Sequence, residues 1–193
     1  GLAGEVMAFA NQGRDVLPFL HVANRLLEEG EDVVLKLHTK RSTHMQHGAQ
    51  WRQELLRQLL GDGHGAQAVA RFAQDRQLGL LAPAGHLLPV REYVGANNAT
   101  LQRLQVRLGL QKDILGAQFS AGSMFWVRLA ALRPLLDAHL PPSAFETEQG
   151  QIDGTLAHAL ERTLGAVCLE AGFTVVTSGT ASSDSTYAYA KRG

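Results

Sequence analysis

The sequence predicts an α/β fold, in which a layered open sheet is flanked by helices. Short apolar runs rich in β-branched residues alternate along the chain with segments whose apolar residues recur at helical spacing. The composition is that of an ordinary soluble domain, with 193 residues, 45% of them hydrophobic and 19% charged. A chain of this length can bury a sizeable core without metals or disulfides. We therefore expect a single α/β domain over residues 1–176.

The first unit is predicted to be a strand, a helix and a second strand. Residues 5–9 form a short apolar run that is followed by turn-forming residues. Asp15 can cap a helix whose apolar residues continue at helical spacing until Gly30 ends it. Residues 33–38 are apolar and β-branched, and a parallel pairing is the usual solution for such a unit.

The same criteria assign the rest of the chain. We expect helices over 49–60, 66–77, 99–108 and about 153–170, and strands over 78–82, 118–127 and 173–176, the second of these being a strand pair or a strand with a bend at Gly122. Residues 41–48 and 83–95 are predicted loops. Residues 177–193 are small and polar with no core-forming pattern, so we expect a flexible C-terminal tail.

Charge and cysteine usage exclude several classes of protein. The 18 basic residues are balanced by 18 acidic ones, which removes the electrostatic case for a nucleic-acid partner or a polybasic membrane anchor. The single cysteine, Cys168, cannot form an internal disulfide, so a reducing compartment is expected. No apolar run approaches the roughly 20 residues that span a bilayer.

A basic cluster follows the second predicted strand. The period of two places Lys36, His38 and Lys40 on one strand face, with Thr39 on the other, at the end where open α/β sheets bind ligands. Further basic residues follow at Arg41, His44, His47 and Arg52. This concentration suits a phosphate or diphosphate, whereas a charged strand end that meets solvent is the alternative and is favoured by spacing alone. The histidines lack the partners of a structural zinc site.

An acidic segment, residues 145–162, precedes and enters the last helix. Asp153 is either the N-cap of that helix or a general base that points into a cleft, and the cap is the better single-residue interpretation. His158 and Arg162 share a face at a spacing of four, and Glu161 can pair with its neighbours in solvent. Ordinary surface pairing explains these three residues equally well.

A third segment combines small residues with aromatic ones. Gly122 permits a close backbone approach or a positive φ, and Ser123 follows it. Phe125, Trp126 and Arg128 come next, and an aromatic ring beside a groove is a common platform for sugars. Because adjacent strand residues face opposite ways, Phe125 and Trp126 are both core only if the strand is buried on both faces.

Taken together, these segments resemble the rhamnan synthesis protein F family, from about residue 6 to residue 165. The motifs that carry the resemblance are Asn11-Gln-Gly13-Arg14-Asp15-Val-Leu-Pro18-Phe-Leu, Lys36-Leu-His38-Thr39-Lys40, Phe119-Ser-Ala-Gly122-Ser123-Met-Phe-Trp126-Val-Arg128 and Asp153-Gly-Thr-Leu-Ala-His158-Ala-Leu-Glu161-Arg162. The resemblance implies a glycosyltransferase of bacterial cell-surface polysaccharide and O-antigen assembly. Such an enzyme would transfer a sugar, rhamnose by implication, from a nucleotide diphosphate donor such as dTDP-rhamnose to a glycan or lipid-linked glycan acceptor.

The family's setting also implies partners and a location. The implied partners are other polysaccharide-assembly proteins or further domains of a longer parent. The implied location is the cytoplasm, peripherally at the inner face of the bacterial cytoplasmic membrane, where nucleotide sugars and lipid-linked glycans meet.

The order of parts is similar to the later portion of a GT-A type glycosyltransferase, where the corresponding strand ends in an Asp-x-Asp site for Mg²⁺ or Mn²⁺. Here it ends in His38-Thr39-Lys40. We therefore expect His38 and Lys40 to stabilise the leaving diphosphate directly, with His38 as a single metal ligand as the alternative. By the same analogy Asp153 is the base that deprotonates the acceptor, with inversion at the anomeric carbon.

The resemblance also implies which residues bind the donor and the acceptor. They are Asn11, Gly13, Arg14, Asp15, Lys36, Thr39, Gly122, Ser123, Trp126, Arg128, His158 and Arg162. A complete enzyme of this type carries an earlier β/α segment that holds the nucleotide base. That segment is either outside this sequence or lost from the domain, which puts the activity of the isolated chain in question.

Two other functions are alternatives to transfer. A non-catalytic glycan-binding or scaffolding module would hold polymer with the same aromatic residues and would be indifferent to nucleotide. A phosphoryl-transfer enzyme is the weaker alternative, because the sequence has no Gly-x-x-x-x-Gly-Lys loop and no paired-carboxylate metal site.

Overall fold

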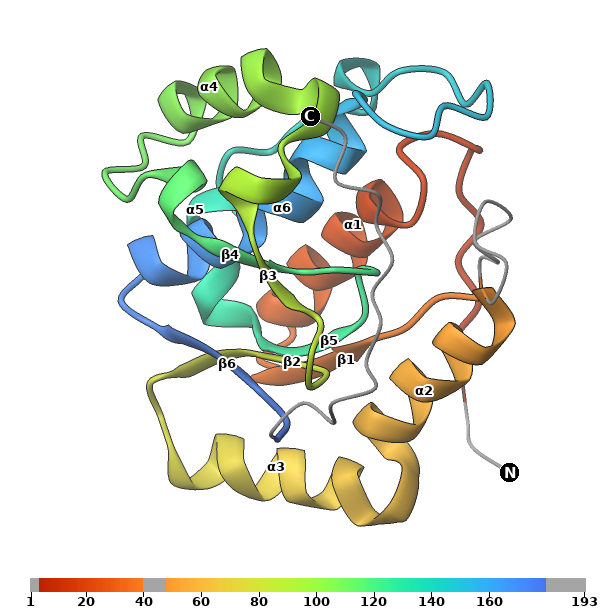
Figure 1. Cartoon of the computed structure of the whole chain (residues 1–193), viewed down its shortest axis with the longest axis vertical. Coiled ribbons are helices and arrows are strands. Elements are labelled where there is room, and N and C mark those ends of the chain that lie inside the picture. Colours follow the sequence, from red (N-terminus) through yellow and green to blue (C-terminus); the bar gives the residue numbers. More distant parts are fainter. Residues whose placement is uncertain (1–3, 40–47, 180–193) are drawn as a thin grey trace.

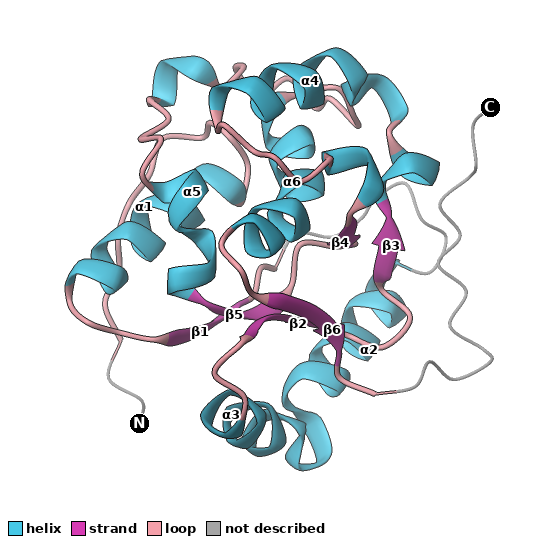
Figure 2. Ribbon diagram, turned by 90° about the vertical axis from the view of Figure 1, so that its left-hand side faces the viewer, coloured by secondary structure: helices cyan, strands magenta, loops and turns pink. Residues whose placement is uncertain are grey.

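The computed structural model describes residues 4–39 and 48–179 and shows a mixed α/β fold with an open sheet flanked by helices. Figure 2 shows α2 (Gly48–Leu60) and α3 (His64–Gln74) on one side of the sheet, and α1 (Val16–Glu28), α5 (Arg133–Leu136) and α6 (Leu156–Glu170) on the other. A further helix, α4 (Asn98–Arg107), lies outside α6 (Figure 1). The predicted fold class is confirmed.

The main sheet has four strands in the order β1-β5-β2-β6. Their bounds are β1 Val33–Lys36, β2 Leu78–Ala82, β5 Phe125–Arg128 and β6 Thr174–Thr177. Among the described residues, β5 lies between β1 and β2 and runs antiparallel to both, whereas β2 and β6 are parallel. A separate antiparallel ribbon joins β3 (Leu87–Pro89) to β4 (Gln118–Ser120).

The prediction of a parallel strand-helix-strand unit at the N-terminus is wrong. Residues 5–9 are not a strand, and they follow the outside of α1, where Glu5 pairs with Arg25 at 2.5 Å and the Phe9 ring stacks on His21. Val6 is 95% exposed, so this apolar run has no sheet face to pack against. The partner of β1 is instead β5, which follows it by about ninety residues in the chain.

Both faces of the sheet are buried. On the side of α1 and α6, Phe125 and Val127 of β5 join the large core. On the other side, Trp126 packs among residues of α2 and α3, including Leu59 and Phe72. The two adjacent aromatic residues of β5 are therefore both packed. Because adjacent strand residues face opposite ways, this requires a strand that is buried on both faces, as β5 is.

Several predicted boundaries shift. The segment 118–127 divides into β4 and β5, which belong to different sheets, and the predicted loop 83–95 contains β3. The sheet extends through Thr177, and the backbone N–H of Ser178 donates to the carbonyl of Ala82 at 2.8 Å. The rest of the predicted tail, residues 180–193, lies outside the described residues. No helix among the described residues is long and apolar enough to cross a membrane.

Candidate functional site

Charged and polar residues from four separate segments meet beside α1 and α6, which pack against each other. The segments are the turn before α1, the end of β1, the turn between β4 and β5, and the first turns of α6. Consecutive hydrogen bonds, an ion pair and close charges connect them. We call this set the polar cluster, and its members are Arg14, Asp15, Lys36, His38, Gly122, Ser123, His158, Glu161 and Arg162.

Lys36 is a buried cation of the cluster. Its Nζ donates to the Asp15 carboxylate and, at 2.6 and 2.8 Å, to the carbonyl and hydroxyl oxygens of Ser123. The rings of Phe19 and Phe125 lie 5.5 and 5.6 Å from the same nitrogen. Three acceptors match the three hydrogens of an ammonium group. Lys36 therefore holds α1, β1 and the Ser123 turn together, and its donors are already used.

Asp15 directly precedes α1, but its side chain does not cap the helix. Burial by itself would raise the pKa of Asp15, yet the positive charges of Lys36 and His38 outweigh burial and lower it to about 2. Asp15 occupies the N-cap position as predicted, but its side chain makes no cap hydrogen bond, because the buried ammonium of Lys36 competes for the same carboxylate.

The turn at Gly122 depends on glycine. Its φ is +88°, and a Cβ there would lie 2.5 Å from the Trp51 ring. The turn exposes both backbone groups of Gly122 to the cluster: the N–H donates to Glu161 Oε1 at 3.1 Å, and the carbonyl oxygen lies 2.7 Å from His38 Nε2. The predicted close backbone approach at Gly122 is confirmed.

The rest of the basic motif after β1 is only partly within the described chain. Thr39 is exposed, and its carbonyl accepts a hydrogen bond from Arg52 at 3.0 Å. Lys40, which was predicted to stabilise the leaving diphosphate, lies outside the described residues, as do Arg41, His44 and His47. The roles of these side chains stay predictions.

Arg14 connects the turn before α1 to the start of α6. It has a φ of +57°, donates from Nη1 to the Gln151 carbonyl at 2.9 Å and contacts Nε2 of His158. The other ring nitrogen of His158 lies 2.7 Å from the hydroxyl of Thr155, the N-cap of α6. Arg14 is half-buried and His158 is buried, so their contact is not a surface charge pair. It stabilises the start of α6.

Asp153 was predicted to be either the cap of the last helix or the catalytic base. As a cap the prediction is wrong, because Thr155 takes that position. Its carboxylate instead accepts from Asn97 Nδ2 at 2.7 Å and the Ala96 N–H at 3.0 Å, and it pairs with Arg162 at 3.2 Å. Burial raises the pKa of Asp153, but these donors and Arg162 lower it overall. Such a carboxylate is a weak base whose acceptor sites are already occupied.

Arg162 is buried and holds three segments in place. Its guanidinium donates to the Tyr93 carbonyl at 2.7 Å and to the His158 carbonyl at 2.9 Å, in addition to its pair with Asp153. The arginine also lies 5.7 Å from the centre of the Phe119 ring. The prediction that His158 and Arg162 make ordinary surface pairs is therefore wrong.

Glu161 is the residue of the cluster that the sequence interpretation missed, since it was assigned to solvent. It is only partly exposed, and surrounding protein raises its pKa to about 7. Arg162, Lys36 and the Gly122 N–H act against this rise, whereas Asp15 adds to it. The signal was present in the periodicity: Ala157, Glu161, Leu164 and Cys168 follow one another at helical spacing, and the other three are buried.

Two predicted sugar-site residues lie away from the cluster. Trp126 and Arg128 point to the α2 and α3 side of the sheet, because they alternate with Phe125 and Val127. Trp126 donates to the Leu59 carbonyl at 3.1 Å. Arg128 is buried, forms an ion pair with Asp32 and donates to the carbonyls of Phe72 and Leu78. The structure therefore gives both residues packing roles.

The turn at the N-terminal end of the cluster contains the remaining predicted residues. Asn11 is exposed and Gly13 is buried with a φ of +66°. A Cβ at Gly13 would lie 2.5 Å from Leu17 and 2.8 Å from Phe145, so only glycine fits this turn. Gln12 donates to the Phe145 carbonyl at 2.7 Å and ties the turn to the segment before α6.

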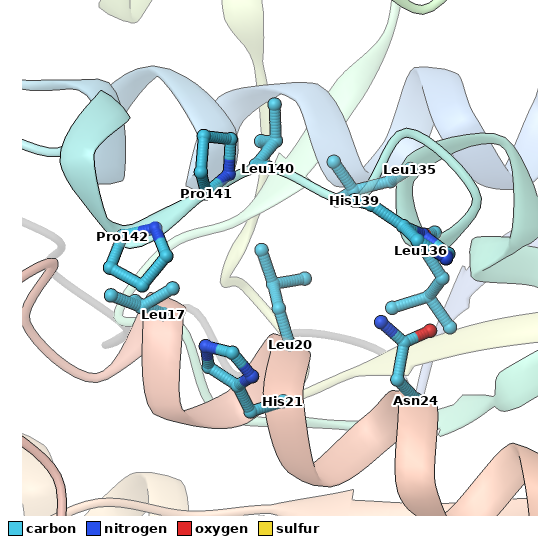
Figure 3. Close-up of a pocket in the computed structure, with 10 residues that line it drawn as sticks. All are labelled: Leu17, Leu20, His21, Asn24, Leu135, Leu136, His139, Leu140, Pro141 and Pro142. Atoms are coloured by element: carbon cyan, nitrogen blue, oxygen red, sulfur yellow. The ribbon is translucent and has the colours of Figure 1, made fainter.

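A separate groove of about 290 Å³ lies between α1 and residues 135–142, which comprise the end of α5 and the segment that follows it (Figure 3). Figure 3 shows Leu17, Leu20, His21 and Asn24 of α1 facing the 135–142 segment. The groove shares no residue with the polar cluster.

The described residues offer little to a divalent metal. Within residues 4–39 and 48–179 no group of three His, Cys, Asp or Glu side chains is placed to hold a metal ion. Asp15 and Asp153, the carboxylates nearest in character to an Asp-x-Asp pair, are bound to cationic partners. His38 would contribute a single ligand, so these residues do not fit the metal of a GT-A enzyme.

Comparisons with known proteins agree with this arrangement of motifs. The model of the family described as rhamnan synthesis protein F matches residues 2–173. Two proteins described as uncharacterized protein WxcX, from Xanthomonas campestris pv. campestris strains B100 and ATCC 33913, are each 55% identical to the chain over 177 residues. The matched region covers 92% of this chain and 26% of each relative, so the chain spans about a quarter of their length. No solved structure gives a significant match.

Proposed function

Because the chain belongs to the rhamnan synthesis protein F family, we propose that it is a glycosyltransferase unit of bacterial cell-surface polysaccharide synthesis. It transfers a sugar, rhamnose by the family's description, from a nucleotide diphosphate donor to the hydroxyl group of a glycan acceptor. Family membership supports the general statement that the chain takes part in the synthesis of rhamnan or a related polysaccharide. The transfer itself, the donor and the acceptor are the proposal.

One observation supports the proposal most strongly. The four motifs that resemble the family are far apart in the sequence, yet each contributes groups to the polar cluster. Hydrogen bonds join Asp15, Lys36 and Ser123, join His38 and Glu161 to Gly122, and join Arg14 and Arg162 to His158. Charged groups that converge from separate segments are typical of a binding or catalytic site.

The contacts within the cluster suggest different roles for its cationic residues. Lys36 has no free donor, so its role is to hold the Ser123 turn in its positive-φ conformation, for which φ is +55° at Ser123. The cationic groups proposed to face the leaving diphosphate are His38 and Lys40, which follow β1. An oxyanion that develops on the diphosphate is stabilised by such preorganised donors. Trp126 and Arg128 are not included in the proposed site.

The proposal is tested by ligand-observed NMR on the 193-residue chain with dTDP-rhamnose, with and without Mg²⁺. We expect donor binding that Lys40→Ala weakens at least tenfold and that Mg²⁺ leaves unchanged. Lys112→Ala is the matched control, because Lys112 is an exposed lysine that does not belong to the polar cluster. Equal loss in the two variants would show that bulk charge, and not a site, binds the donor.

A short rhamnan oligosaccharide distinguishes the alternative function. Binding of the oligosaccharide without any binding of dTDP-rhamnose would contradict transfer by this chain and support a glycan-binding module. Release of dTDP and lengthening of the oligosaccharide would establish the transfer reaction.

A further inference from the structure

Glu161 stands out among the carboxylates of the cluster because one of its oxygens is held and the other is not. Oε1 accepts the Gly122 N–H at 3.1 Å. The hydrogen bonds among the described residues give Oε2 no donor, and the side chain keeps some exposed surface. A carboxylate that is fixed at one oxygen and open at the other is suited to accept a proton from a bound molecule.

Asp15 of the cluster and Asp153, which pairs with Arg162 of the cluster, are both committed to cations. Asp15 is paired with the buried ammonium of Lys36, and Asp153 accepts from Asn97 and Ala96 while pairing with Arg162. Both have lowered pKa values, to about 2 in the case of Asp15, whereas burial raises the pKa of Glu161 to about 7. Environments that separate the pKa values of neighbouring acids assign their roles, and a general base works best near the operating pH.

The charged and polar groups that act on Glu161 come from four segments. They are Asp15 before α1, Lys36 of β1, the backbone N–H of Gly122 in the turn before β5, and Arg162 on α6 itself. Two positive groups, one negative group and one N–H donor surround the carboxyl group. Arg162, Lys36 and the Gly122 N–H favour the ionised form, whereas burial and Asp15 disfavour it, so that a proton can be both taken up and released near neutral pH.

We propose that Glu161 is the catalytic residue that removes the proton from the acceptor hydroxyl, with Oε1 anchored by Gly122 and Oε2 receiving the proton. This inference rests on the proposed transferase function and replaces Asp153 as the expected base. The acceptor oxygen forms a bond to the anomeric carbon as its proton passes to Glu161. The bond from that carbon to the diphosphate oxygen breaks, and the nucleoside diphosphate leaves with the electron pair.

The test is a single-turnover assay with dTDP-rhamnose and a short rhamnan oligosaccharide, at pH values from about 5 to about 9. In the unaltered chain the rate is expected to rise with pH through a midpoint near the pKa of Glu161, about 7. Glu161→Gln is expected to lower the rate by about 10² to 10⁴ and to remove this dependence, with donor affinity unchanged. Glu28→Gln, at an exposed position at the end of α1, is the matched control.

Glu161→Asp serves as the second variant, because it keeps a carboxylate and moves it by one methylene. It is expected to retain a slow transfer with a pH midpoint that is displaced from that of the unaltered chain. A Glu161→Gln variant that is folded and transfers at the original rate and pH dependence would overturn the inference while leaving the transferase function intact. An unchanged pH midpoint in Glu161→Asp would overturn it as well. Absence of any transfer by the unaltered chain would overturn both proposals together.

Discussion

The buried lysine shows how single residues determine the chemistry of this cluster. Lys36 loses hydration on burial, and an unpaired ammonium in that position would be strongly destabilising. Asp15 and Ser123 compensate by supplying three acceptors. The same contacts use up the donors that the sequence interpretation assigned to a diphosphate.

Substitution of Asp15 by Asn is expected to cost about 3 kcal/mol, because it leaves Lys36 buried beside a neutral amide. The lowered pKa of Asp15 also predicts a pH dependence. Its contribution is fully present above the ordinary value of 3.8 and is lost as pH falls through that value towards about 2. Urea unfolding between about pH 2 and pH 7 should show a weaker acid dependence in Asp15→Asn.

The exposed Glu31→Gln substitution is the control for this experiment. It should leave both the stability at neutral pH and the acid dependence as they are. An Asp15→Asn variant as stable as the unaltered chain would mean that Ser123 alone satisfies the ammonium.

At the level of elements, α6 organises the site because it packs tightly on β4 while presenting His158, Glu161 and Arg162 to the cluster. The close approach occurs at Gly165. A Cβ at that position would lie 1.8 Å from the carbonyl oxygen of Gln118. Glycine here allows the backbone of the helix to contact the backbone of the strand directly.

Gly165→Ala is therefore expected to destabilise the protein by about 3 kcal/mol or more, because backbone atoms must move apart. Gly65→Ala is the matched control: Gly65 lies in α3, and a Cβ there would make ordinary contacts of 3.6 Å or more. The control should be neutral or stabilising by up to about 1 kcal/mol, as helix propensity predicts. Chemical denaturation of both variants checks the difference, and similar values for the two would contradict the proposed contact.

The strands show the limits of local patterning at the same scale. Residues 78–82 and 33–36 are strands as their apolar and β-branched runs predict. Their directions relative to one another could not be predicted, because β5 enters between them from a distant part of the chain. Strand pairing is a long-range property that a local pattern does not contain.

At the scale of the whole molecule, the cluster couples folding stability to pH in two opposite directions. Asp15 stabilises the fold above its ordinary pKa, whereas the raised pKa of Glu161 means that the fold prefers its protonated form. The contribution of Glu161 is fully present below its ordinary value of 4.5 and is lost as pH rises through about 7.

Glu161→Gln removes this second dependence, since glutamine resembles the protonated acid. The difference in stability between the variant and the unaltered chain is expected to grow in favour of the variant as the pH rises from about 5 to about 8. Thermal unfolding at the two pH values measures the effect without any substrate, and Glu28→Gln is again the control. Parallel pH profiles for the variant and the unaltered chain would show that Glu161 titrates as an ordinary exposed acid.

The sequence by itself determined the α/β class, the helices and most strands, and the family, because these depend on local periodicity and on the order of motifs. Glu161 was within reach of the same reasoning, since it lies on the apolar stripe of α6. The tertiary structure alone decided strand direction, the burial of Lys36 and Arg162, the partners of the Asp153 carboxylate and the separation of Arg128 from the cluster. These features depend on which distant groups become neighbours, and the partner of a buried charge is chosen by packing and desolvation over the whole molecule.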